Sequence, residues 1–130
     1  GGTVFGPSPR DHSLKMSKKT KRLARKSAWS AKAADEAIKL VDDFTFDEPK
    51  TAKVADILKS LDIEDQKVLI LTADTDKVLY KSARNIPNVN VLEADKPTTY
   101  QILDNDTILI QKSAVEVLQG SIESAEEAVA

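Results

Sequence analysis

The sequence predicts an α/β fold: a three-layer α/β/α domain with a mainly parallel sheet of about four strands, preceded by an irregular loop and a basic helix. Four short runs rich in leucine and β-branched residues occur in order, at residues 37–41, 67–71, 88–92 and 106–110. Each run ends in acidic or polar residues, as strands buried on both faces do. Helical patterns lie between the runs, and strands that alternate with helices form a parallel sheet covered on both faces.

Two segments precede the first strand. Residues 1–9 hold three of the four glycines and two of the five prolines, so we expect irregular structure there. Residues 13–34 are rich in Lys, Arg, Ala and Leu and contain no Gly or Pro, which favours a helix. The chain begins without Met, so a fragment or a processed product is expected.

Four further helices are expected, three of them as connections between strands. Those three occupy residues 49–61, 76–85 and 97–103. The last helix is expected to begin at a capping Ser113 and to run through Leu118. We expect N-caps at Thr51 or Asp47 for the first connection and at Asp74 for the second.

The domain organisation follows from length and composition. A chain of 130 residues has the length of one domain and can bury a core without disulfides. We expect the end of an extended basic loop at residues 1–12, a single α/β domain at 13–120 that opens with a cationic helix, and a frayed acidic tail at 121–130.

The composition excludes several classes of enzyme. Without cysteine there is no disulfide, thiolate nucleophile or Cys-ligated zinc, and the single His12 cannot build a histidine zinc site. No glycine-rich phosphate loop follows any predicted strand, and no nucleophile, base and orienting group can be assembled. We therefore expect no enzyme, no cofactor and no metal. No apolar run approaches the ~20 residues that cross a bilayer, so no membrane partner is expected.

The net charge of −2 conceals an asymmetry. Residues 10–32 carry nine basic residues against one acidic residue, a net charge of +8, whereas the rest of the chain carries −10. On a helical projection the bases from Lys15 to Lys32 fall within an arc of roughly 160°. The opposite arc is small and apolar, with Met16, Leu23 and Ala31 among its residues, so we expect that arc to pack on the sheet.

A cationic stripe of this kind favours a polyanionic partner. Like charges at i,i+4 spacing, such as Lys18 with Arg22, destabilise the helix slightly, and no interleaved Glu relieves them. The small opposite face gives little to insert into a membrane, so RNA or DNA is preferred. A generic DNA-binding helix is a weaker option, because no helix-turn-helix arrangement is visible. Trp29 lies inside the basic arc, where it could serve as a stacking platform for a base. We prefer the alternative that the domain covers the C-terminal turns of this helix, which makes Trp29 a core residue.

Acidic residues at the predicted strand ends support a different hypothesis. Asp42 and Asp43 follow the first strand and Lys112 follows the fourth, so a Mg²⁺-dependent, phospho-accepting, receiver-like signalling domain is the alternative. A receiver domain has five strands and a proline after its lysine, whereas four strands are visible here and Ser113 follows Lys112. The simpler interpretation, which we prefer, is that these acidic residues cap the following helices.

A series of short motifs occurs in a recognisable order along the chain: FGPSPRD at 5–11, KK at 18–19, RLA at 22–24, SAWSAKA at 27–33, VDDF at 41–44, EPKT at 48–51, ARNIPNV at 83–89, AD at 94–95 and YQIL at 100–103. In this order of segments the chain resembles the large-subunit ribosomal protein L-four family, bacterial type, lacking its N-terminal part, and the resemblance extends over roughly residues 1–118. Two positions depart from the family pattern: His12 replaces a usual Tyr, and Trp29 replaces a usual Leu, which favours a core role for Trp29.

The resemblance implies a structural constituent of the large ribosomal subunit, located in the cytoplasm on the ribosome. Implied partners are large-subunit (23S-type) rRNA, neighbouring large-subunit proteins and, for some members, the mRNA of their own operon. Residues 1–12 correspond to the returning end of a long basic loop whose tip, with the first helical region, is absent here. In full-length members that loop reaches the wall of the peptide exit tunnel.

The residues and the resemblance point to one set of RNA contacts. The expected contacts are Arg10, Lys15, Lys18, Lys19, Lys21, Arg22, Arg25 and Lys26, with Phe5, Gly6 and His12 as weaker members. Arg84 and Asn85 are a further option, although a helix C-terminal cap explains them equally well.

Overall fold

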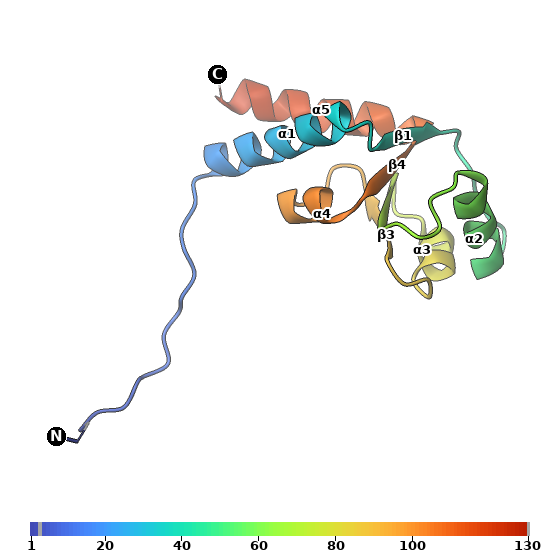
Figure 1. The fold of residues 1–130 in the computed structure, drawn as a ribbon. Coiled ribbons are helices and arrows are strands. Elements are labelled where there is room, and N and C mark those ends of the chain that lie inside the picture. The colour runs from blue at the N-terminus through green and yellow to red at the C-terminus, as the bar shows by residue number, and fades with distance from the viewer. Residues whose placement is uncertain (3, 130) are drawn as a thin grey trace.

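Four parallel strands form the centre of the domain. The computed structural model describes residues 1, 2 and 4–129, with side chains described through residue 123. Figure 1 shows a layered domain and an N-terminal arm, residues 1–17, that runs away from it. The described residues of this arm, 1, 2 and 4–17, form no helix or strand. The strands are β1 (Ile38–Val41), β2 (Val68–Thr72), β3 (Val89–Glu93) and β4 (Thr107–Gln111), in the order β1-β4-β2-β3. Every strand pairing is parallel, which confirms the predicted fold class.

Five helices cover the two faces of the sheet. The helices are α1 (Lys18–Ala34), α2 (Thr51–Ser60), α3 (Lys77–Ala83), α4 (Thr99–Asp104) and α5 (Lys112–Val129). One core cluster joins α1, α4 and α5 to the sheet, and a second joins α2 and α3 to its other face. The strands begin one residue later than predicted, and all residues of the two central strands, β2 and β4, are buried. Continuous burial explains their unbroken apolar runs.

The helix starts differ from the predictions. The first helix begins at Lys18, after a cap at Ser17, and so starts five residues later than the predicted residue 13. Neither Thr51 nor Asp47 caps α2: its N-cap is Lys50, which has no side-chain cap bond and donates its backbone N–H to the hydroxyl of buried Ser82 at 3.0 Å. A distant side chain therefore satisfies this helix end, and no local sequence signal marks it.

The later helices also shift their ends. The cap of α3 is Asp76 rather than Asp74, and its carboxylate accepts the Leu79 N–H at 3.0 Å. The last helix begins at Lys112, one residue before Ser113, and continues to Val129, well past residue 118. The fraying expected for residues 121–130 falls partly outside the described residues. Within the described chain no helix is long and apolar enough to span a membrane.

Candidate nucleic-acid interface

The N-terminal turns of α1 concentrate positive charge. Ser17 caps the helix by accepting the Thr20 N–H at 3.3 Å. No acidic residue lies in the first turn, and Lys18, Lys19 and Lys21 follow the cap directly and are all exposed. Because the helix dipole is positive at this end, each cation placed here is unfavourable by about 0.3–1 kcal/mol. Folding alone does not favour this arrangement, whereas an anionic ligand at the same place does.

The bases of α1 fall into two groups. Lys26 is exposed like the three lysines at the start, whereas Arg22, Arg25 and Lys32 are half-buried against the domain. The Nη2 of Arg25 donates to the backbone oxygen of Asp95 at 2.6 Å. The Nζ of Lys32 donates to the backbone oxygen of Asn105 at 2.7 Å. Some bases of the arc therefore face solvent, whereas Arg25 and Lys32 contact the domain.

The predicted orientation of α1 is wrong. The buried residues of the helix are Ala28 and Trp29, which lie on or beside the basic arc. Two residues of the arc expected to pack on the sheet are largely exposed: Leu23 at 69% and Met16, just before the helix, at 54%. Trp29 decides the orientation because its indole buries far more apolar area than Ala or Ser. The core interpretation of Trp29 is confirmed.

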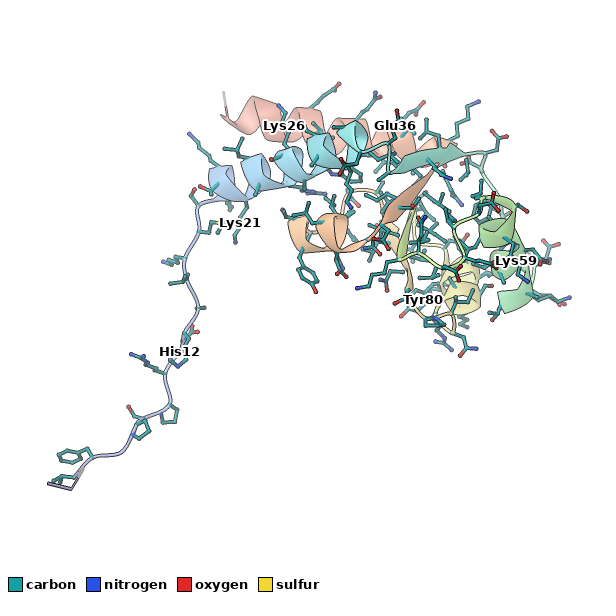
Figure 2. The ribbon with its side chains drawn as sticks, viewed as in Figure 1. His12, Lys21, Lys26, Glu36, Lys59 and Tyr80 are labelled. Atoms are coloured by element: carbon teal, nitrogen blue, oxygen red, sulfur yellow. The ribbon has the colours of Figure 1, made fainter. Side chains whose placement is uncertain are left out.

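The N-terminal arm carries the remaining candidate residues. Arg10, His12 and Lys15 are exposed, as are Phe5 at 88% and Gly6. Figure 2 shows His12 on the arm, well away from Lys21 and Lys26 on α1. The structure thus gathers the helix bases on one element and leaves these five residues along an extended segment that leads into it.

One turn within the arm has an electrostatic consequence. The carboxylate of Asp11 accepts the Ser13 N–H at 2.8 Å and the Ser13 hydroxyl at 2.7 Å. These two hydrogen bonds, the backbone one first, lower the pKa of Asp11. The single acidic residue of the basic segment is therefore held locally, in its charged form, by its own neighbour.

The acidic strand ends act as structural partners. The carboxylate of Asp43 accepts the backbone N–H and the hydroxyl of Ser113, each at 3.0 Å, and so ties the end of β1 to the start of α5. Glu93 accepts a hydrogen bond from Thr75 and pairs with Lys96 at 3.1 Å, and these contacts lower its pKa, the Thr75 bond most. Among the described residues no group of three or more potential ligands could hold a metal ion.

Arg84 lies away from the basic helix. It is the C-cap of α3, with its backbone N–H donating to Tyr80 at 2.9 Å, and α3 covers the opposite face of the sheet from α1. The capping interpretation therefore accounts for Arg84. The contacts that sequence reasoning missed are those of Arg25 and Lys32 with the domain. Their positions at i−4 and i+3 from Trp29 were the available signal.

The fold and the charge pattern define a class: an α/β protein that presents a basic helix and an extended N-terminal arm beside a parallel sheet. Residues 1–121 match the Ribosomal protein L4/L1 family, and the chain belongs to that family. The chain is 44% identical over 122 residues to the large ribosomal subunit protein uL4 of Chlorobium phaeobacteroides strain BS1. The aligned region covers 94% of this chain and 59% of that protein. The protein of the same name from Chloroherpeton thalassium is 47% identical to this chain, and the aligned region covers 94% of this chain and 58% of that protein. The chain thus spans less than two thirds of these relatives.

Proposed function

We propose that this chain is the rRNA-binding α/β portion of a structural, non-enzymatic constituent of the large ribosomal subunit. The observation that carries the proposal is the cluster of exposed lysines in the first turns of α1, placed against the helix dipole and continuous with a basic arm. Family membership supports the same conclusion, because the matched relatives are named as large-subunit proteins. The finer partners follow from the family: large-subunit rRNA first, then neighbouring subunit proteins and an operon mRNA.

The arm and the helix have different roles in this proposal. The exposed lysines bind phosphates, and each phosphate neutralised releases condensed counterions. The arm follows RNA away from the domain as the returning end of a longer loop. Within it Gly6 permits a close approach of the backbone and Phe5 stacks on a base, and the phosphate contacts come from Arg10, His12 and Lys15. In a longer protein that loop contributes to the exit tunnel wall.

A charge-reversal experiment tests the proposal. The variant Lys18→Glu, Lys19→Glu, Lys21→Glu is compared with Lys59→Glu, Lys77→Glu, Lys81→Glu, which makes the same charge change with exposed lysines of α2 and α3. Binding of labelled large-subunit rRNA is followed by anisotropy, with small-subunit rRNA as competitor. We expect the first variant to lose at least tenfold in affinity and the control to lose only a few-fold. Equal losses in both variants would reject α1 as the site.

A further inference from the structure

One face of α1 holds three side chains that contact the domain. Arg25, Trp29 and Lys32 are spaced i, i+4 and i+7, so they lie on one side of the helix. Trp29 belongs to the core cluster that also contains Ile102 of α4 and Ala114 of α5. Packing of α1 against α4 is visible in Figure 1. The indole is thus the apolar centre of the contact, and a cation lies on each side of it along the helix.

Both cations donate to backbone carbonyls that flank α4. Arg25 reaches Asp95, which follows β3 and precedes α4, and Lys32 reaches Asn105, the C-cap of α4. Asn105 is itself buried and donates its side-chain amide to the Gln101 oxygen at 2.6 Å. Hydrogen bonds from charged donors are stronger than neutral ones, and carbonyls at a helix C-terminus carry partial negative charge. The two donors are two turns apart, about 10 Å along the axis, so together they fix the direction of the helix.

We propose that Arg25 and Lys32 are positioning residues that hold α1 on α4, and that they thereby set the direction in which Lys18, Lys19 and Lys21 face the RNA. The attachment needs no ligand, whereas its consequence for RNA rests on the proposed function. This proposal gives Arg25 a role other than the phosphate contact that was expected from the sequence. A guanidinium has five N–H donors and one engages Asp95, so the experiment must separate attachment from phosphate binding.

The test begins with the full chain in the absence of RNA. The variants are Arg25→Gln and Lys32→Gln, their conservative counterparts Arg25→Lys and Lys32→Arg, and Lys19→Gln as a matched loss of one exposed charge. Trp29 is the single tryptophan, so its emission reports whether this face of α1 stays buried. We expect red-shifted emission and about tenfold faster hydrogen exchange in α1 for the two Gln variants, with partial recovery in the conservative pair and no change for Lys19→Gln. Protected sheet amides verify that the domain remains folded.

The second part of the test measures binding of large-subunit rRNA across a salt series. Loss of a phosphate contact lowers the slope of log K against log salt by about 0.7–0.9, whereas loss of orientation weakens binding at every salt concentration and leaves the slope unchanged. We expect the first behaviour for Lys19→Gln and the second for Arg25→Gln. Unchanged Trp29 emission and exchange in both Gln variants would overturn the proposal, as would a slope reduced by one phosphate for Arg25→Gln. If the unaltered chain binds no rRNA, the proposed function fails while emission and exchange still decide the attachment.

Discussion

At the scale of single residues, Trp29 combines a large buried apolar area with a buried N–H group that lacks a hydrogen-bond partner among the described residues. The residue lies in the core formed by α1, α4, α5 and the sheet, with 6% of its surface exposed. Its Nε1, however, is buried without a hydrogen-bond partner among the described residues. An unsatisfied buried donor costs about 1–3 kcal/mol, which offsets part of the hydrophobic gain of the ring. The family resemblance places Leu, which has no such donor, at this position.

A pair of substitutions separates the ring from its N–H group. Trp29→Phe removes the unsatisfied donor with some of the apolar area, so we expect the free energy of unfolding to fall by less than about 1.5 kcal/mol. Trp29→Ala removes nearly the whole side chain and is expected to cost about 3–5 kcal/mol. Urea unfolding followed by circular dichroism measures both values. A cost of Trp29→Phe well above about 1.5 kcal/mol would show that removing the indole N–H brings no gain that offsets the lost apolar area.

At the scale of the elements, two helices end in a strained conformation. The residue after the C-cap of α1 is Glu36, with φ of 55°, and the corresponding residue of α2 is Asp62, also at 55°. In α1 the Ala37 N–H donates to the Lys32 oxygen and the Glu36 N–H to the Ala33 oxygen, which is the Schellman arrangement. Glycine is the usual residue there, because a Cβ in left-handed backbone costs about 1–2 kcal/mol.

Relief of that strain predicts a stabilising substitution. Glu36→Gly removes the Cβ, and the gain exceeds the added flexibility of the unfolded chain, so we expect the free energy of unfolding to rise by about 0.5–1 kcal/mol. Glu36→Ala keeps the Cβ and serves as the control, with no gain expected. The increase should be smaller for Asp62→Gly, since Asp adopts left-handed backbone more readily than Glu. Thermal unfolding of the three variants decides this, and a loss of stability in Glu36→Gly would contradict it.

The elements also show where sequence reasoning succeeds and where it stops. Buried parallel strands require continuous apolar runs, so all four strands were predicted to within one residue at either end. The order β1-β4-β2-β3 was not predictable, because similar runs and crossovers are compatible with several orders. The predicted rotation of α1 is wrong because one large indole, that of Trp29, buries more apolar area than the small residues of the opposite arc. Contacts at long sequence separation, such as Lys50 with Ser82, leave no local pattern.

At the scale of the whole molecule, the charge asymmetry coincides with the architecture. The +8 segment occupies the arm and α1, and the −10 remainder forms the sheet and the other helices. This distribution was predictable from composition. The division of the bases between solvent and domain was not predictable, because it depends on which side of α1 packs against α4. In the proposed function the exposed lysines Lys18, Lys19 and Lys21 bind phosphate, whereas Arg25 and Lys32 attach α1 to the domain.

The salt dependence of rRNA binding tests this assignment most directly. The variant Lys18→Gln, Lys19→Gln, Lys21→Gln removes three outward charges without adding repulsion, and Lys59→Gln, Lys77→Gln, Lys81→Gln is its control on the other face of the sheet. With one phosphate per lysine, the slope of log K against log salt should decrease by roughly 2–3 in the first variant and remain unchanged in the control. An unchanged slope in the first variant would contradict phosphate binding by α1.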